Sequence, residues 1–327
     1  MKALLCGAGG YWGKNVLRNL LKFSELDISC VEPNQSTWDI LPDNVDRFVN
    51  LSEALNHEIP DIALICTPIN NHFLSAVQLL TNNVHCLVQK PLTTDVKQAE
   101  ELIRLADLHK VVLATSHTFL FNPAIQKLKE LIDSGDLGRL QFLHSTRFNL
   151  GLFSRTNSVI EDLGPHDFSI LNFLTSDKKW ESISASGSCH SNTKLIDTCN
   201  ITVNYKDNFQ AYIGLSWISP KKIRQIIVAG DKKMAIYDDT NNDEKLKIYD
   251  AGFNEDENSR FSYRKGAIEI PKLDDSEAIY NEIKYFLDCV KGQKINDISG
   301  PEQSLEVVKM IHAARTSVNQ GGAVYCS

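Results

Sequence analysis

The chain has 327 residues, of which 43% are hydrophobic and 23% are charged. This length predicts about two domains with ordinary cores, and the composition excludes a disordered tail protein, a collagen-like chain and a disulfide miniprotein. The formal net charge of -7 leaves no basic field to hold a nucleic-acid backbone, so we expect no nucleic-acid partner.

No apolar stretch approaches the roughly 20 residues of a membrane-spanning helix, and the run after Met1-Lys2 is too short for a signal peptide. We therefore expect a cytoplasmic protein with no membrane partner. Several of the 8 cysteines lie in apolar runs and none forms a Cys-x-x-Cys pair, which predicts reduced, buried thiols. Cys189-His190 lacks further ligands at a known spacing, so we expect no metal site.

Residues 1–121 alternate short apolar runs with amphipathic stretches. The apolar runs are typical of strands buried on both faces of a parallel sheet, and they cover residues 3–6, 28–31, 62–66, 86–88 and 111–114. Helical patterns lie between them at residues 15–23, 51–55, 72–80 and 96–108. The alternation predicts an α/β domain with a doubly wound parallel sheet, a Rossmann domain, over residues 1–121.

The pattern changes beyond Asn122-Pro123. After a predicted helix at 124–132, runs with a period of two indicate a half-exposed, largely antiparallel sheet over residues 140–148, 183–188, 200–205, 210–217, 225–229 and 233–237. Residues 238–244 and 254–259 are typical of solvated turns. Helices are predicted at 276–289 and 301–318. We therefore predict a second, α+β domain over residues 122–327, with helix 301–318 as the segment that could pack back on the first domain.

A glycine turn, Gly7-Ala8-Gly9-Gly10-Tyr11-Trp12-Gly13, directly follows the first predicted strand and precedes a helix. This arrangement lets backbone N–H groups and the positive end of a helix approach the pyrophosphate of a dinucleotide. Trp12 breaks the strict Gly-x-Gly-x-x-Gly spacing, whereas a Gly7, Gly10, Gly13 spacing is kept. The alternative is a tight structural connection between strand and helix.

Glu32 ends the second predicted strand, nineteen residues after Gly13. A carboxylate there can accept hydrogen bonds from the adenosine ribose hydroxyls, and it repels a 2′-phosphate. No arginine follows immediately to neutralise such a phosphate, so the sequence favours NAD over NADP. The alternative is an exposed acid at a strand end.

Polar residues also follow two later strands, as Thr67-Pro68-Ile69-Asn70-Asn71-His72 and as Gln89-Lys90-Pro91. Ligands of open α/β sheets bind beyond the carboxyl ends of the strands, so these residues are well placed for chemistry. Pro91 biases Lys90 towards extended backbone, which helps to aim its amine into a cleft.

The whole chain resembles the Gfo/Idh/MocA family of NAD(P)-dependent oxidoreductases. The resemblance rests on the segments above and on Phe121-Asn122-Pro123, Gly135-x-x-Gly138 and Asp162-Leu163-Gly164-Pro165-His166-Asp167. The family's Glu-Lys-Pro is Gln89-Lys90-Pro91 here, which keeps a hydrogen-bond acceptor for the nicotinamide ribose but loses the charge. The resemblance implies a Rossmann domain, then a domain whose open-faced sheet commonly mediates dimer or tetramer formation. It also implies hydride transfer between nicotinamide C4 and a sugar or polyol carbon.

We expect the cofactor to contact the glycine turn, the acid after the second strand and the ends of the two later strands. The residues are Gly7, Gly9, Gly10, Tyr11, Trp12, Gly13, Glu32, Thr67, Pro68, Asn70, His72, Gln89 and Lys90. For His72 the alternative is a residue that merely starts a helix.

Asp162 and His166 lie four residues apart, so on one helical turn both side chains project the same way, and Gly164-Pro165 suits a first turn. Oxidation of a secondary alcohol needs a base for the hydroxyl proton. The resemblance implies that Lys90, Asp162 and His166 are catalytic, with His166 as acid/base and Lys90 polarising the oxygen. The alternatives are a helix cap for Asp162 and a structural histidine.

Asn149-Leu150-Gly151 and residues 155–159 resemble the branch of the family that acts on nucleotide-linked sugars. We expect Arg155, as the diphosphate ligand, and Asn157 to bind substrate together with Lys90, Asp162 and His166. A free polyol, as in the inositol dehydrogenases, is the alternative substrate. A non-catalytic dinucleotide sensor, suggested by Gln89, is the alternative function. We expect a homodimer or homotetramer.

Overall fold

The computed structural model describes residues 1–151, 153–255, 257 and 259–326. The chain forms two compact units, one of Met1–Phe121 with Ser276–Lys309 and one of Asn122–Asp275 with Met310–Ser327. The chain leaves the first unit after Phe121 and returns to it at Ser276, whereas the sequence assigned all of residues 122–327 to the second domain. Among the described residues, no helix combines the length and the apolar character needed to cross a bilayer.

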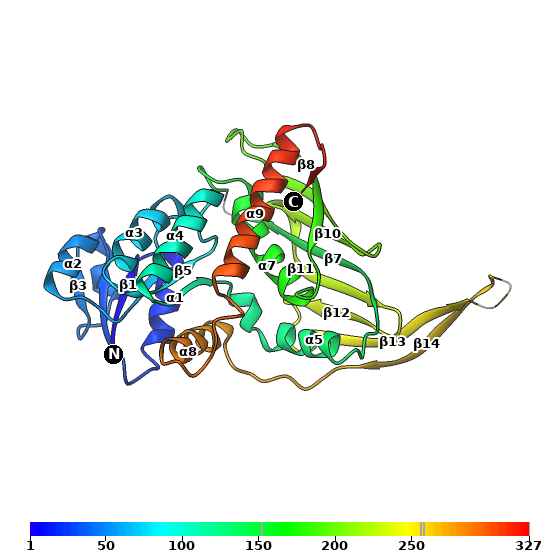
Figure 1. Cartoon of the computed structure of the whole chain (residues 1–327), viewed down its shortest axis with the longest axis horizontal. Coiled ribbons are helices and arrows are strands. Elements are labelled where there is room, and N and C mark those ends of the chain that lie inside the picture. Colours follow the sequence, from blue (N-terminus) through cyan, green and yellow to red (C-terminus); the bar gives the residue numbers. More distant parts are fainter. Residues whose placement is uncertain (152, 256, 258, 327) are drawn as a thin grey trace. The chain divides into compact units, whose positions relative to one another are not determined.

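The first unit contains a sheet of six parallel strands in the order β3-β2-β1-β4-β5-β6 (Figure 1). Its strands are β1 (Lys2–Cys6), β2 (Asp27–Val31), β3 (Asp46–Phe48), β4 (Ile62–Ile65), β5 (His85–Gln89) and β6 (Leu113–Ser116). The doubly wound parallel sheet is confirmed. Only β3 was not predicted, because it has three residues and none of them is buried. The strand order reverses between β1 and β4, where open sheets of this kind bind ligands.

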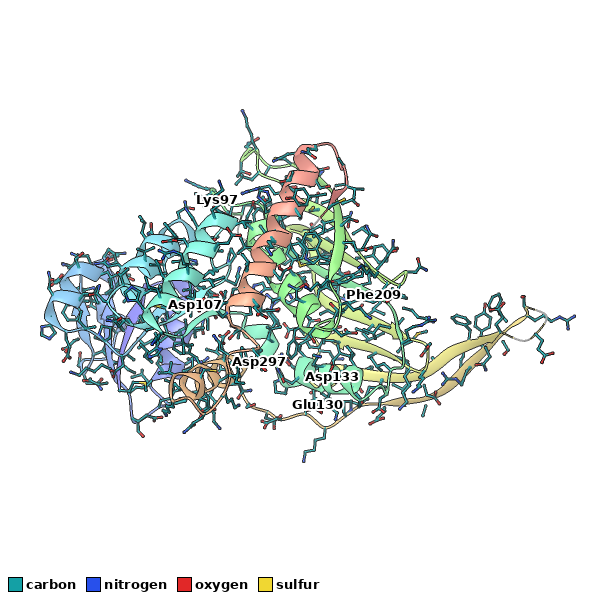
Figure 2. All side chains as sticks on the ribbon, viewed as in Figure 1. Lys97, Asp107, Glu130, Asp133, Phe209 and Asp297 are labelled. Carbon is teal, nitrogen blue, oxygen red and sulfur yellow. The ribbon has the colours of Figure 1, made fainter. Side chains whose placement is uncertain are left out.

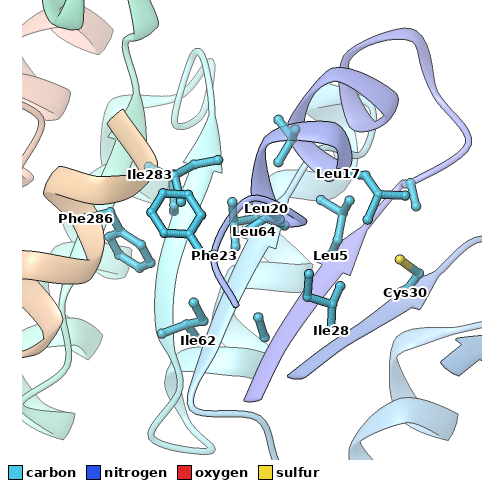
Figure 3. Packing of buried hydrophobic residues seen from close by; sticks show 14 of the residues in the cluster. Leu5, Leu17, Leu20, Phe23, Ile28, Cys30, Ile62, Leu64, Ile283 and Phe286 are labelled. Atoms are coloured by element: carbon cyan, nitrogen blue, oxygen red, sulfur yellow. The ribbon is translucent and has the colours of Figure 1, made fainter. Parts of the chain in front are cut away.

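Two groups of helices cover the two faces of this sheet. They are α1 (Tyr11–Leu20) and α8 (Ala278–Val290) on one face, and α2 (Leu51–His57), α3 (His72–Leu80) and α4 (Val96–His109) on the other. Figure 3 shows Leu17 and Leu20 of α1 and Ile283 and Phe286 of α8 gathered over Leu64 and its neighbours on the sheet. Because α8 supplies part of this core, the chain has to return to the first unit.

The second unit contains a nine-stranded sheet in the order β14-β13-β12-β11-β7-β10-β9-β8-β15. All neighbouring pairs are antiparallel except β7 and β10. The strands are β7 (Leu140–Leu150), β8 (Trp180–Ser188), β9 (Thr198–Tyr205), β10 (Gln210–Ser216), β11 (Ile218–Gly230), β12 (Met234–Asp238), β13 (Leu246–Glu255), β14 (Phe261–Glu269) and β15 (Tyr325–Cys326). The largely antiparallel second sheet is therefore confirmed.

The strands β13 and β14 form a long hairpin that extends past the rest of this sheet (Figure 1). The sequence placed a turn at residues 254–259, but Asn254 and Glu255 belong to β13. Residues 256 and 258 of that expected turn lie outside the described residues.

Helices lie on one face of the nine-stranded sheet, namely α5 (Pro123–Asp133), α6 (Val159–Asp162), α7 (Gly164–Leu174) and the second half of α9 (Pro301–Asn319). Along β7, Leu143 is buried while Phe142 and His144 are exposed, so the other face is open. Figure 2 labels Glu130 and Asp133 on α5, where they pair with lysines of the same helix on its solvated side.

Candidate active site

The glycine turn leads from β1 into α1 through a backbone with no room for side chains. Gly7 has φ +85°, and a Cβ there would lie 2.7 Å from the carbonyl oxygen of Cys66. A Cβ on Gly13 would lie 2.0 Å from the carbonyl oxygen of Gly7, whereas one on Gly10 would meet nothing closer than 3.4 Å. Gly10 is the N-cap of α1 and supplies no side-chain cap, so the first turn of α1 presents N–H groups suited to an anion.

Glu32 follows β2, is 8% exposed, and holds its carboxylate against the glycine turn. Its Oε2 accepts a hydrogen bond from the Gly9 N–H at 2.8 Å, and its Oε1 accepts one from the Asn34 N–H at 2.9 Å. A Cβ on Gly9 would lie 2.8 Å from Oε2, so the missing side chain is what permits this contact. The alternative of an exposed acid is wrong. Each carboxylate oxygen keeps a lone pair that a ribose hydroxyl can use.

Several buried polar atoms at this end of the first unit have no hydrogen-bond partner among the described residues. They are Trp12 Nε1, Thr67 Oγ1 after β4, Gln89 Nε2 at the end of β5, both ring nitrogens of His117 after β6, and Glu282 Oε1 on α8. Folded proteins pair nearly all buried polar atoms, with their own groups or with a ligand. Because parallel strands end at one edge of the sheet, the atoms that follow β4, β5 and β6 lie at the same edge as the glycine turn. The residues present therefore fit a dinucleotide.

Lys90 and Gln89 lie at the end of β5, and the peptide bond from Lys90 to Pro91 is cis. The side-chain Oε1 of Gln89 accepts a hydrogen bond from the Lys90 N–H at 2.9 Å, which leaves the amide nitrogen without a partner. The atom that Gln89 offers is therefore a donor, whereas the sequence led us to expect an acceptor. A donor can bind a ribose oxygen, so a cofactor contact from Gln89 stays a prediction.

His72 is the first residue of α3 and is 1% exposed. Its Nδ1 lies 3.0 Å from the carbonyl oxygen of Pro91, and its Nε2 lies 2.9 Å from that of Thr67. Burial lowers the pKa of this imidazole. His72 thus joins the end of β4 to the segment after β5, and the structure favours this positioning role over a direct contact with the cofactor.

Sequence reasoning missed two residues at this edge, His117 and Glu282. Burial, with the nearby charge of Lys90, lowers the pKa of His117 to about 3, so the ring is neutral at ordinary pH. Burial raises the pKa of Glu282 to about 8, although Ser116 and Thr118 each donate a hydrogen bond to Oε2 at 2.9 Å. His117 could have been found because it follows a strand end. Glu282 could not, because its helix is distant in sequence.

Asp162 and His166 lie on two helices of the second unit that are nearly continuous. Asp162 ends α6, and Leu163 keeps helical backbone angles of −91° and −39° before α7 begins. The four-residue spacing therefore spans one helical turn, as predicted. Asp162 is not a cap, because Ser158 caps α6. The indole nitrogen of Trp217 donates to Asp162 Oδ2 at 3.2 Å, a contact that the sequence did not predict.

Asp167, which follows His166, anchors α7 to the sheet. It accepts hydrogen bonds from Arg147 Nε at 2.6 Å and from Ser145 Oγ at 2.5 Å, both on β7. The side chains of Arg147 and Asp167 are only 4% and 1% exposed. This buried ion pair fixes the first turn of α7 and with it the position of His166.

Arg155 and Asn157 lie between β7 and α6. Arg155 is exposed. The Asn157 N–H donates to Ser154 Oγ at 3.0 Å. Their role in substrate binding stays a prediction. Among the described residues, no group of three or more His, Cys, Asp or Glu side chains is arranged to hold a metal ion.

Comparison with known proteins covers both units. Residues 1–117 match the oxidoreductase family with an NAD-binding Rossmann fold, and residues 125–236 match the GFO/IDH/MocA C-terminal domain. UDP-N-acetylglucosamine 3-dehydrogenase of Acidithiobacillus ferrooxidans is 33% identical over 126 residues, which span only 38% of either chain. Myo-inositol 2-dehydrogenase of Thermotoga maritima is 22% identical over 81% of this chain and 79% of that protein.

Solved structures share the fold along the whole chain. UDP-N-acetylglucosamine 3-dehydrogenase GnnA from Acidithiobacillus ferrooxidans superposes with a TM-score of 0.81 at 22% identity, covering 98% of each chain. GenD2 from gentamicin A biosynthesis, solved in complex with NAD, gives a TM-score of 0.82 at 18% identity, covering 100% of this chain and 96% of that one. Together with the two matching domains, these likenesses establish that the chain belongs to the Gfo/Idh/MocA oxidoreductase family, with an NAD-binding Rossmann fold.

Proposed function

We propose that the protein transfers a hydride between NAD and a secondary alcohol or ketone carbon of a nucleotide-linked sugar. The observation that carries this proposal is the edge of the first sheet, where an uncapped helix, the buried Glu32 and a set of unpartnered polar atoms lie together. Bound NAD supplies the acceptor or donor of the hydride at nicotinamide C4.

The preference for NAD over NADP rests on Glu32. Two backbone N–H groups hold its carboxylate in place beside the glycine turn. A 2′-phosphate on the ribose would bring negative charge against this buried acid, whereas a free 2′-hydroxyl would donate a hydrogen bond to it.

The proposed proton transfer uses three residues of this chain. As the substrate carbon loses its hydride, His166 takes the hydroxyl proton, and the C–O single bond becomes a double bond. Lys90 polarises the same oxygen, and Asp162 orients the groups around it. In the reverse direction His166 returns the proton. These roles follow the family resemblance, and Trp217 and the Arg147–Asp167 pair support them by fixing the two helical turns.

The choice of a nucleotide-linked sugar is supported by Arg155, whose planar guanidinium can bind phosphate oxygens in a bidentate manner. The similarity to UDP-N-acetylglucosamine 3-dehydrogenase supports the same choice. A free polyol is the second candidate substrate, because the similarity to myo-inositol 2-dehydrogenase extends over more of the chain.

Assembly and location are further parts of the proposal. The open face of the second sheet exposes Phe142 and Tyr212, which supports a homodimer or homotetramer built on this face. Sedimentation velocity measures the oligomeric state.

All 8 cysteines are free thiols, which supports a reducing, cytoplasmic location.

The test is absorbance at 340 nm with NAD or NADP and with UDP-N-acetylglucosamine, other sugar nucleotides and myo-inositol. Turnover should require NAD and a sugar nucleotide. Lys90→Met should cut turnover by roughly 10²- to 10⁴-fold while NADH binding changes little. Undiminished turnover in Lys90→Met would show that Lys90 is not part of the catalytic centre. A wild type that is inactive with every substrate would favour the non-catalytic dinucleotide sensor.

A further inference from the structure

Two loops of the second unit join at the backbone of one buried residue, Trp217. We name residues 149–151 and 153–158 the arginine loop and residues 188–197 the histidine loop. The Gly151 N–H of the arginine loop donates to the carbonyl oxygen of Trp217 at 3.1 Å. The Trp217 N–H donates to the carbonyl oxygen of Asp197 in the histidine loop at 2.9 Å. The indole of the same Trp217 binds Asp162. Both loops are therefore fixed beside the proposed catalytic turn.

The histidine loop holds the imidazole of His190 in one orientation. Its Nδ1 lies 2.8 Å from Asp197 Oδ1. The Asp197 carboxylate also accepts the N–H groups of His190 and Ser191, at 2.7 and 2.9 Å. Because this carboxylate only accepts hydrogen bonds, Nδ1 carries the proton and Nε2 is the atom turned away from Asp197. The side chain of His190 is 54% exposed while that of Asp197 is fully buried.

The buried carboxylate of Asp197 places a negative charge beside the ring of His190. Burial raises the pKa of Asp197, but the hydrogen bonds from His190 and Ser191 outweigh it, and the pKa lies below its ordinary value. Asp197 is therefore an anion, and its contact with Nδ1 leaves Nε2 as the ring atom of His190 that can meet a ligand.

The arginine loop is held at both ends and leaves its cation available. The Phe153 ring packs edge-on against Trp217 with centroids 5.7 Å apart, close to the Gly151 hydrogen bond. At the other end Ser158 and Glu161 form a capping box at the start of α6. Arg155 lies between these two attachments and is exposed.

The charge of the two loops is opposite to that of the chain. The protein carries a net charge of -7, yet the loops contain Arg155, Lys194 and His190, and their single carboxylate is the buried Asp197. Fixed donors and a local excess of positive charge suit an anion that carries several oxygens.

We propose that His190, through Nε2, and Arg155 bind the diphosphate of a nucleoside-diphosphate sugar, at a distance from Asp162 that Trp217 sets. His190 is the new element, because Arg155 was expected from the sequence. The assignment rests on the proposed nucleotide-sugar substrate. Asp197 is a positioning residue in this site, since it acts on the ligand only through His190.

The experiment is calorimetric titration of the full-length protein, saturated with NADH, with UDP, inorganic pyrophosphate and uridine. His190→Asn keeps a donor near the position of Nδ1 but removes Nε2, whereas His190→Gln places a donor nearer to Nε2. His57→Asn, an exposed histidine on α2 of the first unit, is the matched control. Melting temperatures show whether each variant is folded.

UDP and pyrophosphate should bind about 10- to 100-fold more weakly to His190→Asn than to the wild type or the control, and His190→Gln should recover part of the loss. Uridine, which carries no phosphate, should bind with the same affinity to the wild type and to every variant. Equal binding of UDP by the wild type and a folded His190→Asn overturns the proposal, as does a wild type that binds neither UDP nor pyrophosphate. Hydride transfer to NAD, measured separately with sugar nucleotides and with myo-inositol, shows whether the proposed function fails as well.

Discussion

Replacing Glu282 with glutamine should change how the stability of the first unit depends on pH. Glu282 is 2% exposed, and burial raises the pKa of its carboxyl to about 8 from an ordinary value of 4.5. Between these two values the unfolded chain releases a proton that the native state retains. The wild type therefore loses stability as the pH rises from about 4.5 to about 8, and this loss is absent at lower pH.

The two pKa values give the size of the effect. Proton linkage predicts that this one group lowers the free energy of unfolding by about 1 kcal/mol at pH 5 and by about 4 kcal/mol at pH 8. Glutamine does not ionise, and its carbonyl oxygen can accept the hydroxyl hydrogen bonds of Ser116 and Thr118. Whatever fixed cost its amide adds, the variant should gain about 3 kcal/mol over the wild type between pH 5 and pH 8.

Urea denaturation at a series of pH values measures this difference, with amide exchange of β1 and β4 reporting on the first unit. Glu277→Gln, at the N-cap of the same helix, is the control. Hydrogen bonds from Arg18 lower the pKa of Glu277 to about 2, so its contribution to stability is present above pH 4.5 and disappears as the pH falls through about 2. That control should differ from the wild type by a nearly constant amount between pH 5 and pH 8. Parallel stability curves for Glu282→Gln and the wild type would refute the reasoning.

Three further changes probe the other parts of the site. Arg147→Met leaves Asp167 charged and unpaired in the interior and should cost about 3 to 5 kcal/mol of unfolding free energy, measured by urea denaturation; a loss below about 1 kcal/mol would contradict the buried pair. Trp217→Phe keeps an aromatic ring but removes the donor to Asp162, so turnover should fall by roughly tenfold while the NADH dissociation constant stays unchanged. An equal fall in NADH affinity would point to misfolding instead. Glu32→Gln should reduce the preference for NADH over NADPH by about tenfold or more in fluorescence titrations, whereas an unchanged ratio would assign the preference to other residues.

The fold was predictable where burial imposes a clear pattern. All of β4 and all but the first residue of β1 are buried, so these two strands appear in the sequence as short apolar runs. The hairpin of β13 and β14 was not predicted because β14 has no buried residue, and its pairing depends on backbone hydrogen bonds that leave no periodic trace.

The candidate site was predictable where its residues are close in sequence. The glycine turn and the pair of Asp162 and His166 are local motifs, and their expected geometry is present in the separate units. Partners that come from distant segments could not be predicted. Glu282 meets Ser116 from a helix 166 residues away, and Trp217 meets Asp162 across 55 residues.

The late return of α8 affects how the protein is made. Ile283 and Phe286 close the core over α1, but they leave the ribosome only after residues 122–275 have been synthesised. At about 5 to 20 residues per second, translation needs roughly 8 to 30 seconds for that insertion. During this interval Phe23, whose ring stacks on Tyr280 of α8 in the folded protein, lacks that partner, so a chaperone that binds exposed apolar side chains would find its substrate there, before the C-terminal segment arrives.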